Sequence, residues 1–350
     1  MLEVSVRALE DKSSSVRKNA IALLSKLILT HPYGLMHGGE LNKSEWNARY
    51  DQIKTQLEAM EKTLAVELSA EEKEREEEPE EEEDEEDGDT TISGKSKRRP
   101  RKSAVDMEAL AASQAQLSAV DADKLMKLRL TARYLSDAIT FIDQVETAIP
   151  QLLELLASTN KAEVLETMDF FRVAHEYKLE GSEQGVRKMV HLIWVKDNTL
   201  VMEDGTSLKG VKSKLLEVYR ALYFDPVADL SPKANVARIA KNMIERTFGA
   251  TLAELTSLEQ LLHTMETENL VHEDVIKKLW AVYEVQRAIP RAQRRGAIMV
   301  LSMLASARKE IVADRLETLL KIGLGPLGAK DIILAKYTVI ALSRVGGTVK

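Results

Sequence analysis

The sequence contains no cysteine, only 5% aromatic residues, and few glycines and prolines for 350 residues. Without thiols the chain can form neither disulfides nor a thiolate metal site, which argues against a secreted, disulfide-bonded class. The scarcity of aromatic and turn residues favours long helices over β-sheets. No apolar run approaches the roughly 20 residues of a membrane span, and the N-terminus lacks a signal-peptide pattern. The composition therefore predicts a soluble, intracellular chain without membrane contacts.

Motifs that carry enzyme chemistry are also missing. No GxxxxGK[ST] phosphate-binding loop occurs, so we expect no ATP hydrolysis. No serine or cysteine nucleophile motif accompanies the histidines of the predicted helices, which are His175, His191, His263 and His272. A GxGxxG string follows an apolar helix rather than a strand, and we interpret it as an inter-helix turn at Gly323, Gly325 and Gly328. The sequence predicts no catalytic residue, cofactor or small-molecule substrate.

The segment 31–43 holds two histidines and a glutamate, in the string HPYGLMHGGE. Metal ligands need fixed spacing and oriented partners, and His31, His37 and Glu40 match no standard pattern. We expect an ordered loop that packs on a neighbouring repeat and no metal site.

One helical pattern returns four times along the chain. The segments that begin at Val16, Val186, Val211 and Gln293 read VRKNAIALLSKL, VRKMVHLIW, VKSKLLEVYRAL and QRRGAIMVLSML. Each has a basic second residue and apolar fifth, eighth and ninth residues, a spacing that marks one face of a helix. A turn with Asp11 precedes the first copy. This unit is typical of HEAT repeats.

The pattern predicts an all-α solenoid of HEAT-type repeats in three parts. Residues 1–68 form helices around the loop 31–43, and 105–350 form a repeat array that continues beyond the chain end. Residues 69–104 should be disordered, because fourteen acids against two bases between Glu71 and Asp87 repel one another and bury nothing. We expect a helix break at Pro150 and further helices at 232–247, 251–265, 272–289, 291–307, 310–322 and 329–344.

Several strings resemble the D-type HEAT-repeat subunits of condensin I. They are VRALEDKSSSVRKNAIALLSKLILTHPYGLMHGGELNKSEW, FFRVAHEYKLEGSEQGVRKMVHLIWVKDN, GVKSKLLEVYRALYFDP and RRGAIMVLSMLASARKEIV. The resemblance covers the chain outside the charged insertion at about 66–104 and places it inside a longer solenoid. It implies a non-catalytic scaffold that binds the kleisin subunit, lies near the SMC ATPase heads and DNA, and supports mitotic chromosome condensation and segregation. A nuclear-transport or phosphatase-type HEAT adaptor is the alternative, which the quoted strings disfavour.

The resemblance also implies a location in the nucleus and on chromosomes, with a cytoplasmic pool. The basic cluster after the acidic tract fits nuclear import better than nucleic-acid contact, although a solvated linker stays open. Its residues are Lys95, Lys97, Arg98, Arg99, Arg101 and Lys102. The acidic tract itself can attract histones or act as a spacer. Two weak phosphorylation signals remain, Ser103 after Arg101-Lys102 and Ser231 before Pro232.

The basic second position of the repeat has two interpretations. Arg17, Arg187, Lys212 and Arg294 can line a face for DNA phosphate or an acidic kleisin segment. They can also bond to turn carboxylates such as Asp11 and join adjacent repeats, and we favour this structural role. Most of the large aromatic residues should be core, and one or two exposed ones would mark a docking surface. They are Trp46, Trp194, Trp280, Tyr219, Tyr223 and Phe224.

Overall fold

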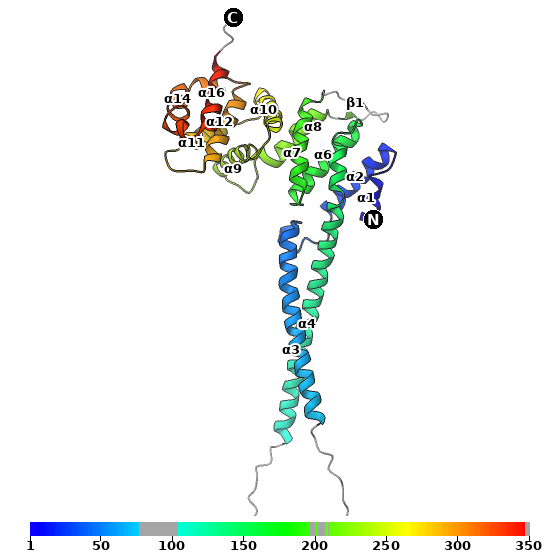
Figure 1. Ribbon diagram of the computed structural model, residues 1–350. Coiled ribbons are helices and arrows are strands. Elements are labelled where there is room, and N and C mark those ends of the chain that lie inside the picture. The colour runs from blue at the N-terminus through cyan, green and yellow to red at the C-terminus, as the bar shows by residue number, and fades with distance from the viewer. Residues whose placement is uncertain (77–103, 197–199, 202–206, 209, 347–350) are drawn as a thin grey trace, which may run out of the picture. The chain divides into compact units, whose positions relative to one another are not determined.

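The computed structural model describes residues 1–76, 104–196, 200–201, 207–208 and 210–346, with side chains for 1–36, 38–63, 122–196 and 210–346. Helices dominate this part of the chain (Figure 1), which confirms the predicted all-α helical-repeat class. Among the described residues, the only strands are two residues long: β1 (Leu200–Val201) pairs antiparallel with β2 (Ser207–Leu208). No helix in this part is long and apolar enough to cross a membrane.

The chain divides into two compact units, Met1–Leu41 with Gln144–Lys350, and Asn42–Asp143. In the first unit, helices pack in successive layers: α1 lies on α2, α2 on α6, and α6 on both α7 and α8. These elements are α1 (Leu2–Ala8), α2 (Ser14–Leu29), η1 (His37–Gly39), α5 (Ile149–Leu155), α6 (Lys161–Glu176), α7 (Ser182–Met189), η2 (Val190–Trp194), α8 (Val211–Tyr219) and the π-turn η3 (Arg220–Phe224).

The layers of the first unit continue through its C-terminal helices (Figure 1). Helix α10 packs on η2, and α12 contacts α9, α10, α11 and α16. The elements are α9 (Pro232–Glu245), α10 (Leu252–Thr267), α11 (Glu273–Glu284), α12 (Arg291–Leu304), α13 (Glu310–Ala313), α14 (Leu316–Gly323), α15 (Pro326–Lys330) and α16 (Ile332–Val345).

Side-chain caps determine where the helices of these layers begin, and a small residue determines how closely two of them approach. Asn160 caps α6, Thr251 forms a capping box with Glu254 at α10, and both satisfy backbone N–H groups that the helix leaves open. Gly185 lets α7 approach α6 closely, because a Cβ there would lie 2.0 Å from the ring of Phe171. The close contact leaves no room for a larger residue at this crossing.

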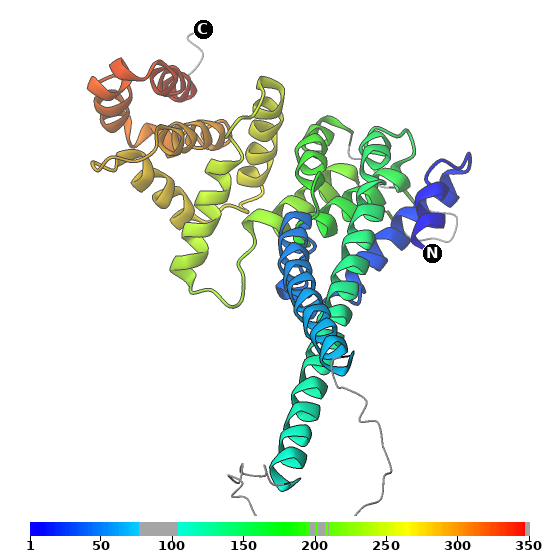
Figure 2. The ribbon, with the colours of Figure 1, turned by 60° about the horizontal axis from the view of Figure 1, so that its bottom comes forward.

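The second unit is a pair of long antiparallel helices, α3 (Lys43–Glu76) and α4 (Ala104–Glu146), which lie side by side in Figures 1 and 2. Trp46 is fully buried, and its ring centroid lies 6.1 Å from that of Tyr134 on α4. Arg129 and Glu61 form an ion pair of 2.7 Å farther along the pair of helices. Two helices alone bury only one stripe each, so most described positions on α3 and α4 stay exposed or half-exposed.

The structure corrects the predicted start of the insertion. We expected an unstructured segment from Ser69, but α3 continues to Glu76. Glutamate, lysine and arginine are good helix formers, so the charge of this stretch does not end the helix. Residues 77–103 lie outside the described part, and their disorder stays a prediction. The compact units also divide the chain differently from the predicted boundaries, because α3 pairs with α4.

Other predicted elements are mostly present. The break at Pro150 is confirmed, since α4 ends at Glu146 and Pro150 lies in the first turn of α5. The single helix expected at 310–322 is wrong, because it divides into α13 and α14. Leu23, expected on the buried face of α2, is 40% exposed, whereas its neighbour Leu24 is fully buried.

Candidate peptide-binding groove

An apolar hollow in the C-terminal helices of the first unit lies along one side of α9. Its volume is about 400 Å³, and it is bounded by the segment between η3 and α9 and by the turn between α10 and α11. Phe224, Ile239, Met243 and Val275 are all at least nine-tenths buried and supply apolar side chains to its lining. Leu230, which is 39% exposed, also lines it. Such a volume accepts two or three side chains of an extended segment.

The wall of this groove is fixed by one buried amide. Asn235 on α9 donates to the carbonyl oxygens of Val227 and Leu230 at 2.9 and 3.1 Å, and accepts from the Val227 N–H at 2.9 Å. Ser231 caps α9 by accepting from the Ala234 N–H, and Pro232 fits the first turn. The groove is therefore formed before any ligand arrives, which lowers the entropy cost of binding.

The charges around the groove are paired. Arg220 donates two hydrogen bonds to Asp225, at 3.0 and 3.1 Å. Across the groove, a hydrogen bond from Lys277 holds the pKa of Asp274 below its usual value. His272 caps α11 with its ring nitrogen, which accepts from the Asp274 N–H. A neutral, internally satisfied rim favours an apolar segment over a charged ligand.

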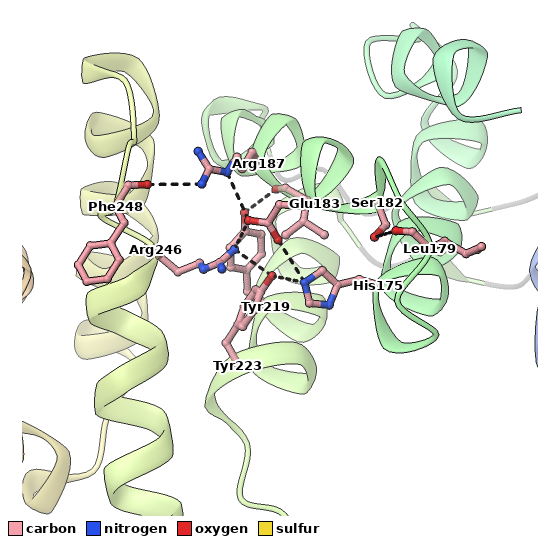
Figure 3. A network of polar contacts seen from close by, with 10 residues as sticks. His175, Leu179, Ser182, Glu183, Arg187, Tyr219, Tyr223, Arg246 and Phe248 are labelled. Carbon is pink, nitrogen blue, oxygen red and sulfur yellow. Dashed lines mark hydrogen bonds and ion pairs between the residues drawn. The ribbon is translucent and has the colours of Figure 1, made fainter. Parts of the chain in front are cut away.

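A polar network connects helices next to η3 and α9 (Figure 3). Glu183 on α7 lies 3.3 Å from His175 of α6, and accepts hydrogen bonds from Arg187 at 3.3 Å and Arg246 at 2.8 Å. The bond from His175, together with the two arginines, lowers the pKa of Glu183 to about 2. Arg246 also donates to the Tyr223 hydroxyl at 3.1 Å, and its guanidinium lies over that ring. The network joins α6, α7, η3 and the end of α9.

Three of the four basic repeat positions bond within the chain. Arg17 pairs with the fully buried Glu163 of α6 at 2.6 Å, and donates to backbone oxygens of the Asp11 turn rather than to its carboxylate. Arg187 also donates to the Phe248 carbonyl, and Arg294 donates to the Tyr283 and Val285 carbonyls. The carboxylate that pairs with Arg17 is therefore that of Glu163, and the expected pairing with the Asp11 carboxylate is wrong.

Lys212 differs from the other three, because it makes no hydrogen bond or ion pair with the described part of the chain. Two residues along α8, Lys214 pairs with Asp169 of α6 at 2.9 Å and takes the joining role. The three arginines thus bond to other segments of the chain, whereas Lys212 does not, and the four positions do not line a common site.

The remaining predicted site residues stand apart from the groove, except Ser231. The basic cluster, Ser103 and most of the acidic tract lie outside the described residues. His31 packs edge-to-face on Tyr177, and the Leu41 N–H bonds to the Tyr177 carbonyl at 2.7 Å, so this loop rests on the end of α6. Burial lowers the pKa of His31. Across the described ranges, no group of three metal-ligating side chains is present.

Most of the large aromatic residues are buried, but Trp194 is 57% exposed. The pattern placed Trp194 on the buried face of a continuing α-helix, whereas η2 is a 3₁₀ helix from Val190. A 3₁₀ helix has three residues per turn, so of the two apolar residues expected on this face only Ile193 stays buried. The Trp194 indole donates to Ser257 of α10 at 2.9 Å, a bond that fixes it on the surface.

Sequence reasoning missed the groove itself. Its residues come from η3, α9, α11 and the segments before α9 and α11, and their meeting depends on tertiary packing. One local signal was present: the string DPVADLSPKAN combines two prolines with a helix cap and then Asn235. That combination is typical of a pinned turn before a helix.

No protein-family model matches the chain. Condensin complex subunit 1 of Schizosaccharomyces pombe is 36% identical over 352 residues, which cover 98% of this chain and 28% of that protein. Its namesake in Saccharomyces cerevisiae is 35% identical over 361 residues, which cover 98% and 30%. The human protein of the same name is 27% identical over 223 residues, 64% of this chain and 15% of that protein. The chain spans less than a third of the length of these relatives.

Proposed function

The chain belongs to the condensin complex subunit 1 family, and from that premise we propose that it is a non-catalytic scaffold segment of condensin. Its helical layers would hold a segment of the kleisin subunit and lie near the SMC ATPase heads and DNA. In this role it would support mitotic chromosome condensation and segregation, in the nucleus and on chromosomes, with a cytoplasmic pool. The names of these relatives support membership of the complex.

The observation that carries the kleisin proposal is the preformed groove beside α9. A scaffold that binds an extended segment needs an apolar channel whose walls are ordered without the ligand. Asn235 supplies that order here through three hydrogen bonds. The paired rim charges leave apolar side chains as the main source of affinity. We therefore assign the groove to an apolar stretch of kleisin.

The test uses the full-length subunit and purified kleisin. Leu230→Glu places a charge in the wall of the groove at a position that is 39% exposed, so the fold should persist. We expect at least tenfold weaker kleisin binding, the usual cost of losing a central apolar contact. Leu320→Glu, on α14 and 51% exposed, is the matched control and should bind like the wild type.

Unchanged binding by Leu230→Glu would contradict the groove assignment. No binding by the wild-type protein, or equal binding to import cargo or a phosphatase, would favour the adaptor of nuclear transport or phosphatase type. DNA binding would be tested separately by a salt titration. Contacts to phosphate release counterions, so affinity should fall steeply with salt and depend little on sequence.

The same proposal includes a role in nuclear import for the basic cluster and phosphorylation of the two serines. We expect deletion of 70–103 to impair nuclear entry while the helix content of the remaining residues persists. The acidic tract removed with it is the proposed contact for histones, a contact that salt should weaken. Phosphate on Ser231 would sit at the first turn of α9, where the helix dipole favours negative charge.

A further inference from the structure

A second hollow lies on the other side of α9, where α9, α11 and α12 diverge. Its volume is about 130 Å³. Helix α9 lines it with Ala237, Ala240 and Ile244, whereas Asn235, Val236, Ile239 and Met243 line the kleisin groove. Its other lining residues are Lys241, Glu245, Phe248, Lys278, Val282 and Gln293. The hollow therefore shares α9 and α11 with the kleisin groove but lies on a separate surface.

The inner lining of this hollow is apolar. Ala237 and Ala240 are small and leave the space open, and Ile244, Phe248 and Val282 add apolar side chains. A volume of 130 Å³ equals about four water molecules, which is room for one branched aliphatic side chain and too little for a cofactor. The hollow fits a single apolar anchor.

Two lysines stand beside the anchor position. Lys278 is exposed and makes no hydrogen bond or ion pair with the described residues. Lys241 is 70% exposed and meets only Glu245, at 3.6 Å. Arg287, between α11 and α12, and Arg291, the first residue of α12, are also exposed and have no partner in the described part of the chain. Glu245 is the only acid in the lining.

The start of α12 also contributes positive electrostatic potential. Its first turn carries no acidic residue, and Pro290 at the N-cap offers no side-chain acceptor. The N–H groups of a helix start carry partial positive charge and need acceptors. Gln293 in this turn lines the hollow. The helix start thus adds to the positive potential that the lysines create.

We propose that this hollow is a docking site for an acidic linear segment of a partner protein. One apolar side chain of the segment sits in the hollow, and its carboxylates lie beside Lys241 and Lys278. A nucleic-acid backbone uses the cations but leaves the apolar lining unfilled. A second copy that docks through this same surface brings lysines against lysines, which disfavours it. The apolar lining and the surplus of positive charge together select the acidic peptide.

The test is photocrosslinking in the purified condensin complex, with a benzophenone amino acid in place of Gln293. The test rests on the proposed function only in assuming that the subunit assembles into condensin. Failure to assemble would be seen before irradiation and is therefore distinct from failure of the docking proposal. We expect a crosslink to a peptide with net negative charge and an apolar residue at the crosslinked position. The double variant Lys241→Glu/Lys278→Glu should reduce the crosslink at least tenfold.

Two further variants separate docking from folding. Lys309→Glu reverses an exposed charge at the N-cap of α13 and should leave the crosslink unchanged. Ala237→Leu fills the hollow from a half-buried helix position and should abolish the crosslink while circular dichroism stays constant. A crosslink to DNA, to a second copy or to a neutral or basic peptide would overturn the proposal, as would no crosslink or no loss on charge reversal.

Discussion

The ion pair of Arg17 with Glu163 and that of Arg129 with Glu61 have nearly the same length, 2.6 and 2.7 Å. The first lies in the layered unit, where the Glu163 side chain is fully buried, and the second lies in the α3–α4 unit, where both side chains are more than 40% exposed. A buried charge depends on its partner, whereas an exposed one has water as an alternative. Removing the arginine should therefore cost more free energy in the layered unit than in the α3–α4 unit.

The largest expected effect is on the buried pair. Arg17→Ala leaves the Glu163 carboxylate buried with only the Ser158 hydroxyl, at 2.5 Å, as a side-chain donor. We expect a loss of about 3 kcal/mol in the free energy of unfolding, measured by chemical denaturation. Adding Glu163→Gln should restore part of that loss, because no charge is then buried. A loss in unfolding free energy no larger than that expected for the exposed pair of Arg129 and Glu61 would contradict the difference between the two units.

A second large effect is expected at the crossing of α6 and α7. Gly185→Ala places a Cβ within 2.5 Å of three atoms of the Phe171 ring, which is itself fully buried. The ring cannot move aside, so we expect a loss of about 2 to 3 kcal/mol, read from the same denaturation curves. Gly34→Ala is the control, since no atom lies within 4 Å of its added Cβ. Equal stability of the two variants would show that the layers are loosely packed.

A smaller effect is expected from pH. The pKa of Glu183 falls to about 2 in the folded chain, chiefly through the hydrogen bond from His175. Because the folded value lies below the unfolded one, Glu183 stabilises the fold fully above about pH 5 and loses this contribution as the pH falls toward 2. Its side chain is 43% exposed, so screening limits the effect to about 1 kcal/mol.

Glu183→Gln provides the check on that pH dependence. The variant should be less stable near neutral pH, and the difference from wild type should shrink between pH 5 and pH 2, measured by urea denaturation at each pH. If the difference in unfolding free energy between the variant and the wild type stayed constant with pH, another carboxylate would be responsible for the pH dependence.

The smallest effect is expected in the α3–α4 unit. Arg129→Ala removes an exposed ion pair, and we expect a change below about 1 kcal/mol. Hydrogen exchange of residues 43–63 and 122–143 should stay within error of wild type. A loss as large as that of Arg17→Ala would erase the distinction between the two units.

The repeat pattern predicted helix positions well because periodic apolar residues and caps act locally. Arg17 shows where local reasoning stops: its basic character was visible, but the partner Glu163 lies on α6, far along the chain. Trp194 shows a second limit, since a change from α to 3₁₀ geometry rotated it onto the surface. The groove could not be predicted, because Asn235 and Val275 meet only through packing of α9 on α11.

The proposal that the groove beside α9 holds kleisin is tested most directly by hydrogen exchange of the full-length subunit with and without kleisin. We predict protection of residues 225–239 and 270–275, which carry most of the groove, and unchanged exchange at 43–63 and 122–143 in the α3–α4 unit. Unchanged exchange at the groove, with protection confined to the α3–α4 unit, would contradict the account.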